Sequence, residues 1–318
     1  INLKTIPDGI GQLTKLIELK LSCNQITEIP KYINQLTDLE ILSFSSNRII
    51  KIYDFGFNLK ELRSLGLSSN QISEIPEYIS QFSTIETLWL SDNKIENIPD
   101  YISELTSLKK LSLSHNKIQM MPDCITQLRE LRELWLVKNE ITEIPNSLEK
   151  LRNLEKLDLS ANKISIIPEG IGKAENLTHL WLNYNQIKEI PDSIGNAEKL
   201  VHFTIGNNQI HRISECIGNL IKLENLGLSR NDIDEMPDSI QNLKNLKFLT
   251  AAANKISKIP PSIEKLSKLE KLWLHNNQIA EIPEFVSSLE NLAELILDEN
   301  KISIVPGCLG RLNKLSRL

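Results

Sequence analysis

The four tryptophans of the chain share one position in a recurring pattern. Each lies four residues before an asparagine, and these asparagines are separated by multiples of 23 residues. The four are Trp89, Trp135, Trp181 and Trp273. A tryptophan left in water is costly, and tryptophan is among the commonest hot-spot residues of protein interfaces. The shared position therefore predicts a surface that binds a partner. Two alternatives stay open: long neighbours such as Lys156 or His179 cover the rings, or the tryptophans were inherited when repeats were duplicated.

Four of the five histidines are expected on the same surface. They are His115, His179, His202 and His275. His179 and His202 hold identical positions in adjacent repeats, so their side chains could come within ~5 Å of each other. Two ligands do not make a metal site, which needs a third and a fourth. We therefore expect no metal and no other cofactor, and a pH-sensitive contact is an alternative to ordinary surface histidines.

Aromatic and apolar residues gather around these histidines. The stretch from Thr178 to Asn276 holds the most apolar part of the predicted surface, and we expect it to be the centre of binding. The expected partner-binding residues are Trp89, Trp135, Trp181, Trp273, His179, His202, Tyr184, Phe248, His275 and Arg230. The earlier part of the surface is more charged but self-neutralising, as with Arg132 beside Glu155. Exposed pairs of this kind add roughly 0–1 kcal/mol each to stability and contribute more to partner choice.

Residues suited to catalysis do not come together in any motif. The sequence has no Gly-x-Gly-x-x-Gly, no phosphate-binding Gly-x-x-x-x-Gly-Lys, no nucleophile elbow, no His-Glu-x-x-His and no Cys-x-x-Cys. Carboxylates are plentiful, but their repeat spacing puts them on solvated faces instead of pairing them in a cleft. We therefore expect that the chain is not an enzyme.

A 23-residue unit must position all of these side chains, and it is clearest between Leu177 and Pro191. This segment reads LTHLWLNYNQIKEIP, with the skeleton LxxLxLxxNxIxxIP, in which Ile187 follows Asn185 by two residues. The same asparagine–isoleucine spacing recurs without insertion or deletion. The asparagines are Asn24, Asn47, Asn70, Asn93, Asn116, Asn139, Asn162, Asn185, Asn208, Asn231, Asn254, Asn277 and Asn300. Thirteen consecutive matches predict a repeat architecture.

Each unit is predicted to contain a short strand and then one or two helical or 3₁₀ turns. Leu180 and Leu182 are two residues apart, as on one face of a strand, whereas the apolar residues that follow are spaced by three and four. Pro30 suits a first helical position, where its missing N–H costs nothing. We expect each asparagine to be buried where the chain turns inward, bonding its own loop and the next one. Ala174 and Ala197 replace core leucines, which should bring the two repeats closer on the helical side.

The second repeat departs most from the pattern. Tyr53 replaces its proline, and Gly56 takes the usual isoleucine position between Phe55 and Phe57. We expect local repacking, in which aromatic side chains fill the volume that the glycine leaves empty. A contact site on the convex side is the alternative.

The pattern resembles the leucine-rich repeat over the whole chain. Its IPxxIxxL half is similar to the 23-residue intracellular class found in Ras-binding scaffold proteins, Scribble-type polarity scaffolds, Roco GTPases and many bacterial leucine-rich-repeat proteins. The resemblance implies an α/β leucine-rich-repeat solenoid, a curved horseshoe with a parallel β-sheet on its concave face and short helical or 3₁₀ turns on its convex face. It also implies a single domain over residues 1–318 with about 13 repeats, and recognition of a protein by the concave face. The matching residues belong to the core, so they do not identify the partner.

Composition narrows the classes of partner and compartment. The formal net charge is −5 with both signs interleaved, so nucleic acid is a poor ligand. No apolar run approaches ~18 residues and no secretory signal is recognisable, so we expect no membrane insertion. Cys124, Cys216 and Cys308 recur every four repeats, roughly 19 Å apart and beyond disulfide reach. Unpaired cysteines favour a reducing compartment, and we expect a cytoplasmic location.

Both ends of the sequence fall within a repeat, without a polar capping unit, so we expect a piece of a longer protein. The expected function is a non-enzymatic scaffold for a protein partner. One alternative is the recognition or regulatory arm of a larger signalling enzyme, such as a GTPase, kinase or ubiquitin ligase. The other is a secreted adhesin or receptor ectodomain, although cysteine-rich caps are missing. The sequence leaves the identity of the partner and the oligomeric state open.

Overall fold

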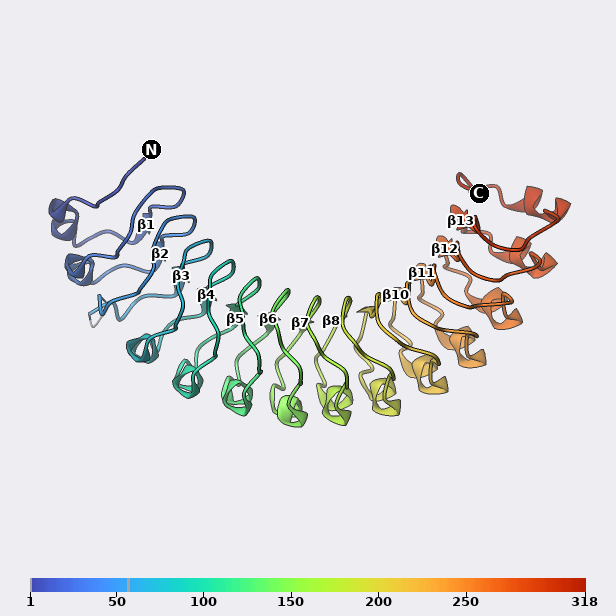
Figure 1. Ribbon diagram of the computed structural model, residues 1–318, viewed down its shortest axis with the longest axis horizontal. Helices are drawn as coiled ribbons and strands as arrows, with labels where there is room; N and C mark the ends of the chain where they lie inside the picture. The colour runs from blue at the N-terminus through green and yellow to red at the C-terminus, as the bar shows by residue number, and fades with distance from the viewer. Residues whose placement is uncertain (1, 56–57) are drawn as a thin grey trace. The chain divides into compact units, whose positions relative to one another are not determined.

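The computed structural model describes residues 2–55 and 58–318. Its internal contacts group into two compact units, Ile1–Asp158 and Leu159–Leu318. In each unit the chain repeats one motif, in which a three-residue strand is followed by a turn, an extended segment and a five-residue 3₁₀ helix (Figure 1). The strands lie at one edge of the repeats and the 3₁₀ helices at the other (Figure 1). The expectation of one continuous domain stays a prediction.

The first unit has a parallel sheet in which each strand pairs with the next strand of the chain. Paired residues are 23 positions apart, so equivalent side chains of successive repeats stand side by side. The strands are β1 (Glu18–Lys20), β2 (Ile41–Ser43), β3 (Ser64–Gly66), β4 (Thr87–Trp89), β5 (Lys110–Ser112), β6 (Glu133–Trp135) and β7 (Lys156–Asp158). The 3₁₀ helices are η1 (Asp8–Gln12), η2 (Lys31–Gln35), η3 (Glu77–Gln81), η4 (Asp100–Glu104), η5 (Asp123–Gln127) and η6 (Asn146–Lys150).

The second unit has the same parallel pairing between successive strands. Its strands are β8 (His179–Trp181), β9 (His202–Thr204), β10 (Asn225–Gly227), β11 (Phe248–Thr250), β12 (Lys271–Trp273) and β13 (Glu294–Ile296). Its 3₁₀ helices are η7 (Glu169–Lys173), η8 (Asp192–Asn196), η9 (Glu215–Asn219), η10 (Asp238–Asn242), η11 (Pro261–Lys265), η12 (Glu284–Ser288) and η13 (Gly307–Arg311). Arg317 adds an isolated parallel bridge to Glu294.

The core is a stack of leucine and isoleucine side chains between the strands and the 3₁₀ helices. The middle residue of a strand points inward, so Leu180 is fully buried while its neighbours His179 and Trp181 are half-buried on the other side. Leu182 and Ile187 are also fully buried. These placements confirm the predicted two-residue alternation and the predicted apolar skeleton.

The recurring asparagine joins each turn to the repeat before it. Asn185 donates from Nδ2 to two carbonyl oxygens of its own turn and, at 3.0 Å, to the carbonyl of Leu159. Its Oδ1 accepts the N–H of Ile164 at 3.0 Å. The prediction that the side chain bonds the next loop was therefore wrong. The backbone N–H of Asn185 already bonds the next repeat at Asn207, so the side chain satisfies backbone groups of the preceding one.

The residue before each of these asparagines has a left-handed backbone, with φ between 53° and 60°. The residues in this conformation are Cys23, Ser46, Ser69, Asp92, His115, Lys138, Ala161, Tyr184, Asn207, Arg230, Ala253, Asn276 and Glu299. None is glycine, although this region of backbone space disfavours side chains. Hydrogen bonds to the following repeat fix the turn, such as Tyr184 N–H to the carbonyl of Gly206 at 2.8 Å.

Proline precedes the 3₁₀ helix instead of beginning it. Pro30 has an extended backbone (φ −76°, ψ 148°), and its carbonyl accepts the first helical bond from the N–H of Ile33 at 3.1 Å. The predicted first helical position was therefore one residue too late, and only Pro261 occupies it among the described helices. Where Ser214 replaces proline, its Oγ accepts the N–H of Cys216 at 3.1 Å and caps the helix.

The irregular second repeat buries an aromatic side chain. Phe55 is 1% exposed, and its ring centroid lies 6.5 Å from that of Tyr78 and 5.9 Å from that of Phe82. This confirms the predicted aromatic repacking for Phe55. Gly56 and Phe57 lie outside the described residues.

Glycine lets the 3₁₀ helices of the second unit approach closely. A Cβ atom added to Gly172 in η7 would lie 1.9 Å from the carbonyl oxygen of Ser193 in η8. The equivalent Gly195 and Gly218 are enclosed less tightly, with a backbone oxygen 2.6 Å from the added Cβ in each case. Ala174 and Ala197, which motivated the prediction of closer packing, are each 1% exposed beside these glycines. The close approach itself depends on glycine, because only a residue without Cβ fits.

Candidate functional site

The outward side of the strands carries most residues that the sequence selected. We define the strand face as the first and third residue of each strand together with the two residues before the recurring asparagine. The strand residues stand on the opposite side from the buried leucines, whereas the other two belong to the turn. Each unit has its own part of this face.

All four tryptophans are the third residue of a strand, as predicted. In the first unit Trp89 ends β4, Trp135 ends β6, and Ser112 of β5 stands between them in register. Trp89 is 37% exposed, whereas the other three, including Trp181 and Trp273 in the second unit, are half-buried. Trp135 is held by a hydrogen bond from Nε1 to a carboxylate oxygen of Glu133 at 3.3 Å.

The two strand histidines form the aromatic cluster at β8 and β9. The rings of His179 and His202 stack with centroids 4.5 Å apart, which confirms their predicted approach. The His179 ring also lies 5.2 Å from the Trp181 ring, and its Nδ1 is 2.8 Å from the hydroxyl of Thr178. His179 therefore covers part of the tryptophan, as the alternative interpretation expected, while the tryptophan stays partly accessible.

A second cluster connects β11, β12 and β13. The Lys271 ammonium lies 5.7 Å from the ring centroids of both Phe248 and Trp273, within cation–π range. Glu294 binds this ammonium at 2.9 Å and accepts the Trp273 indole N–H at 3.0 Å. The Lys271 hydrogen bond, aided by the indole N–H, holds the pKa of Glu294 below its ordinary value. The side chains of Lys271, Glu294 and Trp273 therefore hold one another in place through charged contacts.

The remaining site residues project from the turns after the strands. Tyr184 and Arg230 occupy the left-handed position and are exposed, the tyrosine by 61%. His275 comes two residues before Asn277 and is half-buried, and its Nδ1 is enclosed without a hydrogen-bond partner among the residues that the structure describes. Sequence reasoning did not distinguish these turn residues from the strand residues.

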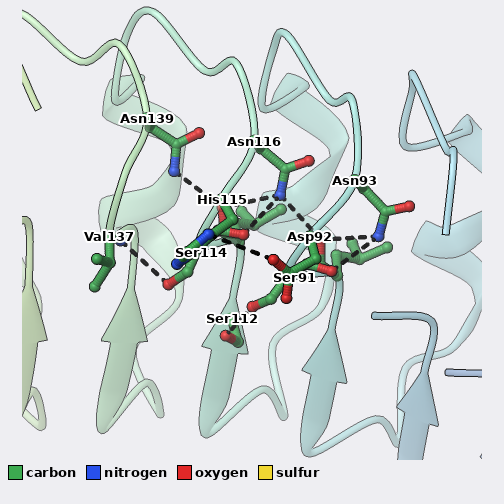
Figure 2. Close-up of polar contacts among 11 residues, drawn as sticks. Ser91, Asp92, Asn93, Ser112, Ser114, His115, Asn116, Val137 and Asn139 are labelled. Atoms are coloured by element: carbon green, nitrogen blue, oxygen red, sulfur yellow. Dashed lines mark hydrogen bonds and ion pairs between the residues drawn. The ribbon is translucent and has the colours of Figure 1, made fainter. Parts of the chain in front are cut away.

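Several serines lie on the strand face around β4 and β5, among them Ser91, Ser112 and Ser114 (Figure 2). The hydroxyls of Ser91 and Ser112 lie 2.6 Å apart, and Ser114 Oγ accepts a backbone N–H of the next repeat at 3.1 Å. His115 Nδ1 is 3.4 Å from a carboxylate oxygen of Asp92. Within residues 2–55 and 58–318, no serine hydroxyl bonds the His115 ring, so serine, histidine and aspartate do not form a nucleophilic relay here.

The self-neutralising pairs predicted in the first unit are present. Arg132 and Glu155 approach to 3.4 Å, and Lys156 and Glu133 to 3.3 Å. Glu133 also binds Lys110 at 3.3 Å. The two lysines outweigh its desolvation, so the pKa of Glu133 lies below its ordinary value.

Groups suited to metal binding or nucleophilic attack are not assembled in the described part of the chain. Its histidines, cysteines and carboxylates form no cluster of three that could hold a metal ion. Burial raises the pKa of the Cys124 thiol to about 11, which disfavours the thiolate that a nucleophile needs.

Comparison with known families agrees with the repeat geometry. A family model described as "Leucine-rich repeat region" matches residues 51–161 and 206–318, and one described as "Leucine rich repeat" matches 14–72 and 175–233. The chain belongs to the leucine-rich repeat family. The fold of this family is typical of modules for protein–protein interaction and is generally non-enzymatic.

Solved structures from bacteria and a plant are similar to this leucine-rich repeat chain. A leucine-rich repeat protein of Leptospira interrogans is 32% identical, with 99% of this chain and 93% of that chain covered and a TM-score of 0.82. An internalin from Listeria monocytogenes is 25% identical, with 96% and 88% covered and a TM-score of 0.86. The leucine-rich repeat ectodomain of a membrane receptor kinase from Arabidopsis thaliana, solved in complex with Casparian strip integrity factor 2, is 28% identical over 98% of this chain and 45% of that one, with a TM-score of 0.64. No curated protein matches the sequence.

The helices of the described residues are short 3₁₀ turns. None of them has the length and apolar character needed to cross a bilayer.

Proposed function

We propose that this chain is a non-enzymatic module that binds a protein partner on its strand face, with β8 to β12 as the centre of the contact. The observation that carries the proposal is the partial exposure of Trp181 and Trp273 at equivalent strand positions, although neighbouring side chains contact both rings. Large aromatic side chains held in a fixed orientation lose little entropy on binding and supply much of an interface's energy. Phe248 and Tyr184 extend the aromatic area.

We place this module in the cytoplasm, as part of a scaffold for signalling. Support comes from the four unpaired cysteines, Cys23, Cys124, Cys216 and Cys308, which suit a reducing compartment. Fractionation of the source cells with an antibody to this chain tests the location, and recovery outside the cytoplasm would reject it.

One alternative gains support from a relative. The Arabidopsis structure is the ectodomain of a receptor kinase, so a recognition domain joined to a signalling enzyme, or facing the cell exterior, is the second candidate. The full coding sequence decides between them, because a kinase, GTPase or ligase domain or a secretion signal would lie outside residues 1–318.

The test of the proposed surface is affinity capture from a lysate of the source organism. The wild-type chain is compared with a variant in which Trp89, Trp135, Trp181 and Trp273 are replaced by alanine. A matched control replaces four exposed apolar side chains off the strand face. These are Ile50, Met120, Ile166 and Ile304. Circular dichroism verifies that all three proteins are folded.

Retention of a protein by the wild type and the control, with loss by the tryptophan variant, is the expected result. Two half variants, Trp89/Trp135 and Trp181/Trp273 to alanine, then locate the contact, and the second should lose more. Equal capture by the wild type and the tryptophan variant would place binding elsewhere and reject the proposal.

A further inference from the structure

On the strand face of the second unit, a row of five equivalent residues runs from one tryptophan to another. Trp181, Thr204, Gly227, Thr250 and Trp273 stand in register on five consecutive strands. The outer two are large and the inner three small, and the tryptophans stand about four strand spacings, or roughly 19 Å, apart. The residues after the inner strands are also small. They are Gly206, Ser229 and Ala252.

The strand face around this row lacks acidic side chains. From β8 to β12 the strand face contains no aspartate and no glutamate. Two of the carboxylates that border it are bound to lysine, Glu224 to Lys247 at 2.9 Å and Asp232 to Lys255 at 2.6 Å. From β8 to β12 the strand face itself therefore offers no carboxylate to a basic partner.

Arg230 is the positively charged residue of this part of the strand face that is not in an ion pair with the described residues. Its guanidinium is exposed and has no ion-pair partner among the residues described, whereas the other strand-face cation, Lys271, is neutralised by Glu294. The backbone around it is rigid, because its N–H donates to the Ala252 carbonyl at 2.7 Å and its own carbonyl accepts the N–H of Asn208 at 3.2 Å. The Arg230 side chain therefore starts from a turn of constrained backbone geometry, beside the small residues of the inner strands.

Resting on the proposed function, we infer that the partner presents an acidic peptide segment to this row, with a carboxylate on Arg230 and apolar side chains against Trp181 and Trp273. Charge complementarity selects the acidic segment, since the guanidinium can bind a carboxylate through two parallel hydrogen bonds and no acid of the strand face from β8 to β12 competes for it. A stretch of about six extended residues spans the distance between the two tryptophans.

The test begins with a phage-displayed library of random twelve-residue peptides selected on the wild-type chain. Selected peptides are synthesised with a fluorescein label, and their affinity is measured by fluorescence anisotropy at two salt concentrations. The variants are Arg230→Glu and a control of equal charge change, Arg212→Glu, which lies off the strand face. Both substitutions are compatible with the fold, because Glu299 and Glu189 occupy the equivalent positions of other repeats.

The inference expects enrichment of peptides with Asp or Glu beside apolar residues. Arg230→Glu should weaken their binding by about tenfold or more and reduce its dependence on salt, while Arg212→Glu should leave it within about twofold. Exchanging the acidic residue of the peptide for lysine should restore binding to Arg230→Glu.

Each other outcome has a defined meaning. Peptides that bind without acids, are insensitive to Arg230→Glu and are lost when Trp181 and Trp273 become alanine would overturn the acidic segment and leave the proposed surface standing. Peptides insensitive to all of these changes would overturn the surface as well. An absence of any enriched peptide would overturn the inference of a peptide segment and leave a larger folded partner to be sought by the capture experiment.

Discussion

The carboxamide oxygen of Asn185 accepts the backbone N–H of Ile164, 21 residues earlier, at 3.0 Å. The same oxygen acceptor recurs in other repeats, as from Asn208 to Ile187 and from Asn231 to Ile210, each at 3.0 Å. The isoleucine that follows each asparagine by two residues is therefore the residue whose amide the next asparagine binds. The contact fixes the position of the donating amide, and isoleucine stands there because its side chain is fully buried, as in Ile164.

Asn185→Ala should destabilise the second unit by about 1–3 kcal/mol, because it leaves the buried amide of Ile164 without a partner. The carbonyl of Leu159 loses one of two donors and keeps the bond from Asn162. Urea unfolding measures the loss, and hydrogen exchange should show faster exchange at the Ile164 amide. Gln186→Ala, which removes an exposed amide side chain next door, is the control and should stay within ~0.5 kcal/mol. Unchanged exchange at Ile164 in the Asn185 variant would contradict this contact.

Leu182→Ala should cost ~2–5 kcal/mol by leaving a cavity in the core, since Leu182 is fully buried. Trp181→Ala, one residue earlier, should cost less than half as much because its larger side chain stands half-exposed on the strand face. Urea midpoints at an unchanged m-value provide the comparison. Equal losses from the two substitutions would mean that the strand is in the opposite orientation.

Features that depend on buried apolar spacing could be predicted from the sequence. The alternation of Leu180 with Trp181, the burial of eight of the thirteen asparagines and the pairing of His179 with His202 all follow from a 23-residue period and the two-sided geometry of a strand. The other five asparagines, which were also expected to be buried, are half-buried. These features need only knowledge of which residues are equivalent, and the repeat supplies that.

Features that depend on backbone conformation or on side-chain rotamers could not be predicted from the sequence. The left-handed residue before each asparagine has no compositional signal, because Tyr184, Arg230 and Ala253 are as acceptable there as serine. The contact of Lys271 with two aromatic rings requires a particular rotamer. Gly172 and its equivalent glycines were the sequence signal for close packing of the helices. The prediction was based on the nearby alanines instead.

Stability should depend on the charge of Glu215 at acid pH. Its carboxylate accepts the N–H groups of Ser239 at 2.8 Å and Asp238 at 3.2 Å, and these bonds hold its pKa below the ordinary value. A lowered folded pKa stabilises the protein above the unfolded value of about 4.3, and the contribution is lost as pH falls through the folded pKa. Glu215→Gln should lower Tm by at most ~3 °C at pH 7 and by less at pH 3.

The control for Glu215 is the first residue of η7. Glu169→Gln, where the carboxylate makes no hydrogen bond to the described residues, should show no such dependence on pH. A difference between wild type and Glu215→Gln that is as large at pH 3 as at pH 7 would show that the carboxylate charge is not responsible.

Gly172→Ala should destabilise the second unit by about 1–3 kcal/mol, because the added Cβ would meet the backbone of η8 and the two helices would have to separate. Gly310 is the matched control, since it is the fourth residue of η13 as Gly172 is of η7, and no atom lies within 4 Å of its added Cβ. Gly310→Ala should be neutral or stabilise by up to ~1 kcal/mol through the unfolded state. Thermal unfolding of both variants measures the contrast, and equal effects would show that alanine at this helix position acts through the unfolded chain and not through the approach of the repeats.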